Sequence, residues 1–413
     1  MVHKNRWLIA LSAIAVHVSI GSAYAYSVFK KPLAASLGWS STETSLAFTL
    51  AIFFLGLSAA VLGPRVERWG PRVSALAAAV LFASGQIISG LGVAAGMLPV
   101  FYLGYGVVGG VGLGIGYLAP VSTLVRWFPD RRGLATGMAV MGFGAGALLA
   151  SPVATRLIEA WGVPPTFYAM GTAYLVVMAL GARYLERPPE GWQPPGATSA
   201  ANGPRAAADL AQLSAREAVR TPRFWMLWLL MFVNISAGIL LISVAAPLAQ
   251  ETGGLSAAAA AAMVGVMGLF NGGGRIGWSA LSDYAGRMNV FTLFFAVQLV
   301  LFGLLPSLSG ALALQAVLFT VVSMYGGGFA LLPAFIADLF GTRELGAILG
   351  RLLTAWSVAG IAGPMAAAAV RDATGSYALA FHLVAALLVV ALATSFLLRH
   401  DVARLRLRAA VAA

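Results

Sequence analysis

The chain of 413 residues contains no cysteine, and only 10% of its residues are charged. The absence of cysteine excludes a disulfide scaffold and thiolate catalysis. Acidic residues are also few, 14 against 26 lysines and arginines, which gives a formal net charge of +12. The basic residues stand in short clusters between apolar runs rather than in a continuous stripe, so the charge does not indicate nucleic-acid binding.

Apolar sequence is abundant instead. Hydrophobic residues make up 60% of the chain and the mean hydropathy is +0.87, far outside the range of soluble proteins. Because a helix needs about 20 apolar residues to cross a bilayer, the runs predict an all-α integral membrane protein with twelve spans. The predicted spans are 7–29, 43–63, 73–93, 97–127, 133–158, 165–184, 222–250, 257–282, 289–308, 310–338, 345–370 and 376–398.

One long segment between spans is rich in Pro, Gly and Ala. It predicts a division into an N-terminal six-helix half (1–184), a central loop (185–221) and a C-terminal six-helix half (222–413). Within the loop, "SARE" (Ser214 to Glu217) is typical of a capping box at the start of a short surface helix. Most basic residues fall in loops on one side if the N-terminus is cytoplasmic, so the positive-inside rule predicts cytoplasmic termini and a cytoplasmic central loop. The expected location is the cell (inner) membrane.

Short motifs repeat between the two halves in the same order and at nearly the same displacement. "GPRVERWGPR" (Gly63 to Arg72) corresponds to "SALSDYAGR" (Ser279 to Arg287), "RWFPDRRGLATG" to "DLFGTRELGAILG", and Pro152 to Pro364. An acid and a basic cluster at a short loop predict ion pairs that tie helix ends together on the cytoplasmic side and break when the halves rock. The residues expected in this conformational motif are Glu67, Arg68, Arg72, Arg131, Arg132, Asp283 and Arg287.

A single arginine interrupts the eighth predicted span. In "NGGGRIG" (271–277), Arg275 is the only charge between Glu251 and Asp283. An arginine near the middle of a membrane helix costs about 2.5 to 3.5 kcal/mol on insertion scales, so it is expected to face a cavity or a partner. Since all acids fall in loops or at span ends, the expected counter-ion is the carboxylate of a cargo, which a guanidinium binds through two parallel hydrogen bonds. The alternative is a cation satisfied by backbone carbonyls.

Asn271 lies one turn before Arg275 on the same helix face and is expected to contact the substrate or to hold the guanidinium. The glycines around this site also match G-x-G-x-x-G, as does "GYGVVG" at Gly104 to Gly109. Neither match follows a predicted strand, so a dinucleotide site is not expected. The glycines suit close helix packing instead, and no cofactor or metal is expected.

Six plus six spans, a long central loop and the pattern G-x-x-x-[DE]-R-x-G-x-R after span two resemble the major facilitator superfamily over essentially the whole chain. "YSVFKKPLAASLGWS" (Tyr26 to Ser40), "WFPDRRGLATG" and "DLFGTRELG" resemble its branch of oxalate/formate antiporters and monocarboxylate transporters. The resemblance implies a major facilitator fold with a central site and alternating access. Asn271 stands where animal monocarboxylate transporters have an aspartate implicated in proton coupling. Trp356 stands where oxalate transporters have a second cation, which favours a monoanion.

Polar aromatic residues complete the expected cavity. The helices that line the cavity in the resembling fold carry Tyr117, Tyr325, Tyr24 and Tyr26 here, and Trp356 is expected to form an apolar wall. Each tyrosine has the alternative role of a packing or interfacial residue. His17, near the middle of span one, is a candidate for carrying a proton, and its alternative is a hydrogen-bonded packing histidine.

The expected function is secondary active transport of a small, lactate-like monocarboxylate across the membrane, with proton symport, by a monomer. The nearest alternative is an oxalate/formate-type exchanger. A substrate sensor without transport has the same cavity. A membrane enzyme is disfavoured because no catalytic cluster lies within the spans, and a channel because no filter-like loop appears.

Overall fold

The structure, a computed structural model, describes residues 4–190, 192–194 and 209–412, and over these it is helical without a strand. The first group of helices is α1 (Arg6–Gly21), η1 (Ser22–Tyr26), α2 (Ser27–Leu37), α3 (Ser41–Ala94), α4 (Leu98–Phe101), η2 (Tyr102–Val108), α5 (Gly109–Trp127), α6 (Arg132–Trp161) and α7 (Val163–Tyr184). The second is α8 (Ala215–Val219), α9 (Pro222–Glu251), α10 (Ala257–Ala285), α11 (Arg287–Leu304), η3 (Leu305–Ser307), α12 (Ala311–Phe340), α13 (Leu345–Leu352), α14 (Thr354–Thr374) and α15 (Ala378–Ala412).

Ten helical segments of the described chain are long and apolar enough to cross a membrane. One of them contains most of α3, whose 54 residues change direction at Gly70, where φ is +78°. At 1.5 Å per residue the two parts of α3 add up to roughly 80 Å of helix. This is more than twice the thickness of a bilayer core and is enough for two crossings. The 29-residue helix α10 lies outside these ten segments. The all-α membrane architecture is confirmed, and the exact count of twelve spans stays a prediction.

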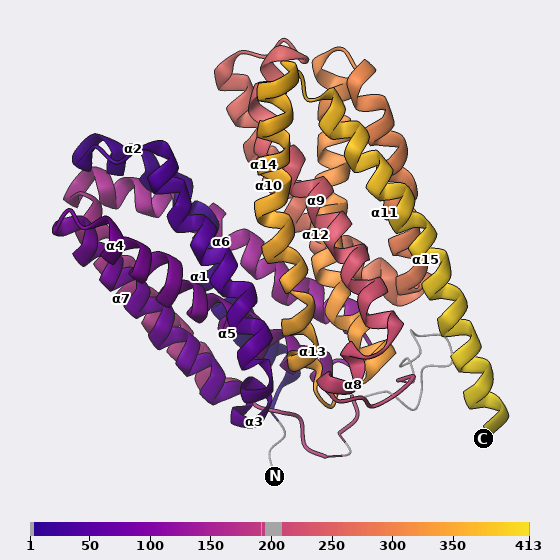
Figure 1. The fold of residues 1–413 in the computed structure, drawn as a ribbon. Coiled ribbons are helices and arrows are strands. Elements are labelled where there is room, and N and C mark those ends of the chain that lie inside the picture. The colour runs from indigo at the N-terminus through magenta and orange to yellow at the C-terminus, as the bar shows by residue number, and fades with distance from the viewer. Residues whose placement is uncertain (1–3, 191, 195–208, 413) are drawn as a thin grey trace.

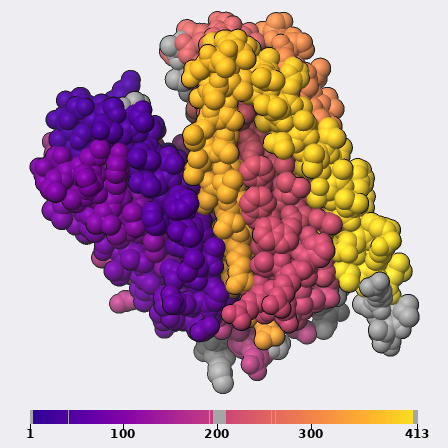
Figure 2. Space-filling view, viewed as in Figure 1, coloured from indigo at the N-terminus to yellow at the C-terminus, as the bar shows by residue number. Residues whose placement is uncertain are grey.

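The helices form two groups that meet at one end and separate at the other. Figure 1 shows α1 to α7 on one side and α9 to α15 on the other, with both chain ends and α8 at the end where the groups meet. The space-filling view in Figure 2 shows a cleft between the groups that opens toward the opposite end. Contacts between the groups run from α6 to α10 and α12, and from α3 to α13 and α14. We call the end where the two groups meet the closed end, and the opposite end the open end. The sequence boundaries of the two halves stay a prediction.

Helix ends follow local sequence signals. Ser214 and Glu217 form the predicted capping box of α8, with the Ser214 N–H donating to Glu217 Oε2 at 2.7 Å and the Glu217 N–H donating to Ser214 Oγ at 3.3 Å. The glycine run is a more selective packing device than the sequence suggests. A Cβ on Gly274 would lie 2.2 Å from the Ser323 carbonyl oxygen on α12, whereas Cβ atoms on Gly272, Gly273 and Gly277 would meet nothing within 4 Å.

Candidate functional site

Arg275 on α10 is buried between the two groups of helices, with 1% of its surface exposed. Its Nη1 donates to the Val140 carbonyl oxygen on α6 at 2.9 Å, and its Nε donates to Asn271 Oδ1 at 3.2 Å. Asn271 therefore holds the guanidinium, one of the two roles expected for it. Because α6 and α10 belong to different groups, the arginine also links the halves. A guanidinium has five N–H donors, so backbone and amide oxygens satisfy it only in part.

Arg275 differs from the other buried charged residues in having no carboxylate partner. Two other arginines of the described chain are buried, Arg132 and Arg287, and each forms an ion pair with an aspartate. No carboxylate oxygen of the described residues lies within 4.0 Å of Arg275. A buried charge normally has a partner, so this cation lacks the group that would neutralise it.

Aromatic rings from four helices and from η1 surround this region. Trp356 on α14 is 4.7 Å from Phe329, 5.8 Å from Phe143 and 6.2 Å from Tyr117, measured between ring centroids. The Arg275 Cζ lies 5.6 Å from the centroid of the Phe329 ring. Trp356 thus lies among apolar rings, and its role as a wall of the cavity stays a prediction. Arg275 has 1% of its surface exposed, and low exposure to solvent strengthens any electrostatic contact that it makes.

Tyrosine side chains add polar groups to this aromatic cluster. Tyr24, Tyr117 and Tyr325 all lie close enough to Arg275 to interact with it electrostatically. The Tyr117 hydroxyl is buried and has no hydrogen-bond partner among the residues that the structure describes. Buried polar groups are almost always paired. An unpaired hydroxyl near an unpaired cation is the arrangement of a site that a ligand completes.

Tyr26 does not lie in this cluster, although the sequence analysis included it. Its hydroxyl donates to the Thr44 carbonyl, and its ring lies 4.6 Å from that of Tyr105. Tyr24, which the sequence analysis also included, lies beside the cluster, with its ring 6.4 Å from Trp356. Both tyrosines lie in the 3₁₀ segment η1. A 3₁₀ segment has 3.0 residues per turn rather than 3.6, so it changes which side chain faces the interior.

His17 is buried on α1 and lies between two backbone carbonyls. Its Nδ1 is 2.8 Å from the Ala139 oxygen and its Nε2 is 3.2 Å from the Tyr117 oxygen. A neutral imidazole has one N–H, whereas an imidazolium donates from both nitrogens. The ring also stacks on Tyr117 at 5.2 Å. Both readings from the sequence thus stay open, and proton transfer by His17 stays a prediction.

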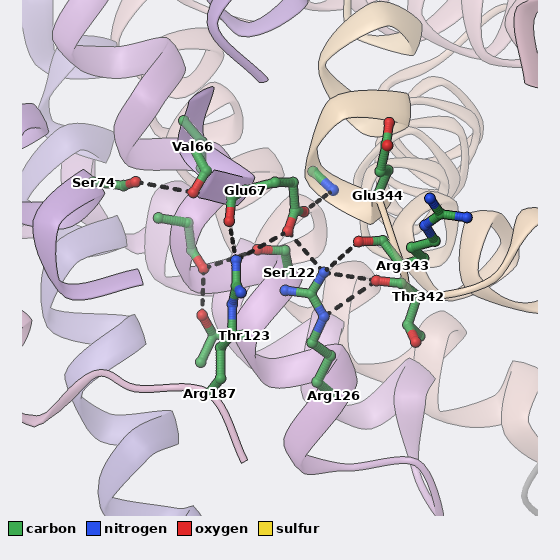
Figure 3. A network of polar contacts seen from close by, with 12 residues as sticks. Val66, Glu67, Ser74, Ser122, Thr123, Arg126, Arg187, Thr342, Arg343 and Glu344 are labelled. Atoms are coloured by element: carbon green, nitrogen blue, oxygen red, sulfur yellow. Dashed lines mark hydrogen bonds and ion pairs between the residues drawn. The ribbon is translucent and has the colours of Figure 1, made fainter. Parts of the chain in front are cut away.

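Charged residues tie the two groups at the closed end, where Glu67 of α3 is central (Figure 3). Its Oε1 accepts from the Gly346 N–H at the start of α13 at 2.6 Å, and its Oε2 is 2.8 Å from Arg126 Nη2. Arg126 also donates to the Thr342 carbonyl oxygen, at 2.6 Å from Nη2. A carboxylate at a helix start is stabilised by the free N–H groups and the helix dipole.

Asp283 of α10 makes the reciprocal contact with the first group. It accepts from the Gly133 N–H at 2.8 Å and from the Leu134 N–H at 3.0 Å, both at the start of α6. Arg287 pairs with Asp283 at 2.7 Å and with Asp338 at 3.1 Å. Each half therefore supplies a carboxylate that caps a helix of the other half, as the repeated motifs allow.

The conformational motif from the sequence is partly different from the observed one. Arg132 pairs with Asp209 at 2.7 Å and with Asp338 at 3.0 Å. Within the described chain, Arg68, Arg72 and Arg131 form no ion pair. Arg126, Asp209 and Asp338 were not singled out. Arg126 and Asp338 lie in the repeated segments after spans four and ten, so the repeat itself was a signal for both.

Known proteins resemble this chain along most of its length. A family model described as Major Facilitator Superfamily matches residues 12–364. The oxalate:formate antiporter of Oxalobacter formigenes is 29% identical over 362 residues, which cover 87% of this chain and 83% of that protein. Monocarboxylate transporter 11 of Homo sapiens is 27% identical over 93% of this chain and 80% of its own length. Apicoplast pyruvate carrier 1 of Toxoplasma gondii is 26% identical over 63% and 59%, respectively.

Solved structures share the fold. The transporter FucP in its outward conformation superposes with a TM-score of 0.73 at 13% identity, over 94% of this chain and 98% of that chain. The proton:xylose symporter XylE superposes with a TM-score of 0.74 at 16% identity, over 95% of each chain. Two groups of membrane helices, closed at one end by reciprocal contacts, fit that fold. With the family match, they show that the chain belongs to the Major Facilitator Superfamily and is a transporter of that superfamily.

Proposed function

We propose that the protein carries a small monocarboxylate, lactate-like in size, across the cell (inner) membrane by alternating access. The observation that supports this most directly is the buried Arg275, which has no carboxylate partner among the described residues. A cargo carboxylate would displace the Val140 oxygen from Nη1 and bind the guanidinium through two parallel hydrogen bonds. The names of the relatives, an oxalate:formate antiporter, a pyruvate carrier and a monocarboxylate transporter, support a carboxylate cargo.

The groups around Arg275 suit a short apolar tail and one further polar contact. The Tyr117 hydroxyl is free to donate to a carboxylate or to a hydroxyl of the cargo. Trp356 and Phe329 present apolar ring surface. Small-molecule sites are mostly apolar with a few placed hydrogen-bonding groups. A single central cation favours a monoanion, because a second carboxylate would be buried without a partner.

The difference between the two ends of the molecule supports alternating access. With the predicted cytoplasmic termini, the cleft in Figure 2 opens to the outside and the closed end faces the cytoplasm. Neutralisation of Arg275 by the cargo removes its link to Val140, so the halves are free to rock about the site. A co-transported proton keeps the movement of a monoanion electroneutral. His17 is the candidate carrier, since an imidazolium satisfies both carbonyls that face it.

Uptake of radiolabelled lactate into proteoliposomes tests the role of the cation. We expect Arg275→Ala to reduce uptake about 100-fold, the effect of losing two charge-assisted hydrogen bonds of about 1.4 kcal/mol each. Arg275→Lys keeps the charge but loses the paired geometry, so we expect a loss of about tenfold. Neither variant strands a carboxylate, so both are expected to fold. Arg404→Ala, on the exposed part of α15, is the matched control. Undiminished uptake in both Arg275 variants would remove this arginine from the mechanism.

An imposed proton gradient separates symport from exchange. In symport, an inward proton gradient drives lactate accumulation in vesicles that contain no substrate. An obligate exchanger ignores the gradient and requires substrate on the opposite side. Oxalate as a competitor then tests the cargo charge, since a site with one cation is expected to favour lactate. Stronger competition by oxalate than by unlabelled lactate would favour the oxalate/formate-type exchanger.

A further inference from the structure

A cavity of about 780 Å³ lies at the closed end, beside the Glu67 contact. Its walls come from α3 and the segment after α7 on one side, and from the start of α8, the segment before α13, and α13 on the other. The basic residues that line it are Arg68, Arg187, Arg216, Arg343 and Arg351. The cavity is thus cationic and is shared by the two halves of the molecule.

The carboxylates in this cavity already have other partners. Glu67 accepts from the Gly346 N–H and pairs with Arg126. Arg187 contacts the Glu67 carbonyl and lies 3.6 Å from the carboxylate. Glu344 accepts from the Ala215 N–H at the start of α8, at 2.9 Å. Both acids are therefore used as helix caps, and they leave most of the surrounding positive charge without compensation.

Four of the five arginines lack an acidic partner among the residues that the structure describes. No carboxylate oxygen of the described chain lies within 4.0 Å of the guanidinium groups of Arg68, Arg216, Arg343 and Arg351. Arg351 is the most informative of them, because its Nη1 is buried and has no hydrogen-bond partner in the described part of the chain. A buried N–H without an acceptor is costly. Arg351 also lines an adjoining cavity of about 370 Å³ with Arg216 and Arg220, which extends the cationic surface.

We propose that this cavity binds a soluble phosphate-bearing anion with at least two negative charges, taken from the solution at the closed end. Guanidinium groups match phosphate oxygens in geometry as well as charge. The volume fits a ligand larger than a three-carbon acid. Arg68 comes from one half, and Arg343 and Arg351 come from the other, so a bound anion bridges the halves and holds this end shut. It is a second site, separate from Arg275, and does not depend on the proposed cargo.

Binding of pyrophosphate to the full-length protein in detergent tests the site, with chloride at matched ionic strength as the reference. We expect pyrophosphate, and not chloride, to raise the melting temperature, because a ligand of the folded state stabilises it. Arg216→Gln and Arg351→Gln are each expected to weaken pyrophosphate binding about tenfold. Arg404→Gln removes one exposed arginine at the same end outside these cavities and should leave binding unchanged. Arg351→Lys, which keeps the charge, should retain more affinity than Arg351→Gln.

The contrary result is equal pyrophosphate affinity in wild type, Arg216→Gln and Arg351→Gln, or equal stabilisation by chloride, and either overturns the proposal. A lipid headgroup offers the same phosphate chemistry. Nanodiscs of phosphatidylcholine alone and of phosphatidylcholine mixed with phosphatidylglycerol separate the two sources. Pyrophosphate binding that is equal in both supports a soluble ligand. Loss of pyrophosphate binding in the anionic nanodiscs assigns the cavity to lipid and overturns the proposal.

Discussion

At the scale of single residues, Asn271 is the side chain that holds the Arg275 guanidinium. Its Oδ1 lies 3.2 Å from the Arg275 Nε. Asn271→Asp puts a carboxylate at this position with almost no change in shape. We expect lactate uptake at neutral pH to fall about tenfold, because the new anion competes with the cargo for the guanidinium. Uptake should recover at acid pH as the new carboxyl takes up a proton, and the pH profile of KM measures this. An unchanged profile would show that Asn271 does not control the charge of Arg275.

Two tyrosines permit a matched comparison. Tyr117→Phe removes a hydroxyl that has no partner in the described chain, so the folded protein should lose no stability. If the hydroxyl contacts the cargo, KM for lactate rises about fivefold to tenfold. Tyr26→Phe removes the hydrogen bond to the Thr44 carbonyl instead, so it should cost about 1 kcal/mol of stability and leave KM unchanged. Thermal melting and uptake kinetics on both variants check this. The reverse pattern would place the working hydroxyl on Tyr26.

At the level of residues, the sequence singles out candidates where the surroundings are extreme. Arg275 and Asn271 stand out because a charge in an apolar run must be satisfied. The Val140 carbonyl was not predictable, because every residue has a carbonyl and only the approach of α6 to α10 selects this one. The position of Tyr26 outside the aromatic cluster has a similar cause. Which tyrosine faces Trp356 depends on the local winding of η1, and the side-chain pattern of the sequence does not encode it.

At the scale of helices, the carboxylates at the closed end make the contacts that the proposed alternating-access cycle would break. Asp283→Asn keeps the shape but loses the charge that accepts from the Gly133 and Leu134 N–H groups. We expect the closed end to open about tenfold more often, since one charge-assisted contact across the halves is weakened by about 1.4 kcal/mol. Distances between spin labels on Trp69→Cys and Tyr284→Cys, which are exposed at this end, measure the open fraction.

Glu43→Gln is the control for that experiment. Glu43 caps α3 through Ser40 with the same chemistry, but the contact stays within one half. We expect its loss to leave the label distances at the closed end unchanged. An equal effect of the two substitutions would mean that Asp283 acts on its surroundings only through general helix stability.

Helix positions were largely predictable, and their exceptions have local causes. Long apolar runs locate the spans because the bilayer fixes their minimum length. The predicted spans 43–63 and 73–93 both belong to α3, because Gly70 is the residue between them that leaves the helical conformation. The last helix continues to Ala412, well past the predicted end at 398. Beyond residue 398 the helix contains both basic and apolar residues, which is compatible with a helix outside the membrane. A search for long apolar runs does not detect such a helix.

At the scale of the whole molecule, cargo binding should shift the balance between the two ends. Because the chain has no cysteine, introduced cysteines are the only thiols available for labelling. Trp161 and Leu312 are exposed at the open end, at the end of α6 and the start of α12. We expect lactate to add a population with a shorter distance between spin labels at these two positions. The same pair on an Arg275→Ala background is the control, and a lactate response that persists there would contradict closure through Arg275.

The two-part architecture followed from the repeats, whereas the state of the molecule did not. Glu67 and Asp283 are equivalent by sequence, and their reciprocal caps reflect this equivalence. Nothing in their spacing decides which end is shut, because in the proposed cycle the same chain adopts both arrangements. The choice depends on small differences in contact energy between the ends. Such differences are sums over many residues of both halves.

The hydrogen bond from Arg275 to the Val140 oxygen has a consequence for discrimination among solutes. The arginine already donates to a neutral oxygen, so an entering molecule must bind the guanidinium more strongly than this carbonyl dipole does. An uncharged hydroxyl or amide binds the guanidinium no more strongly than the carbonyl that it replaces, whereas an anion binds it more strongly. We therefore expect the charge of a solute, rather than its size, to decide first whether it binds. Carboxylic acids with different tails should all be able to displace the Val140 oxygen, whereas sugars and alcohols of similar dimensions should not.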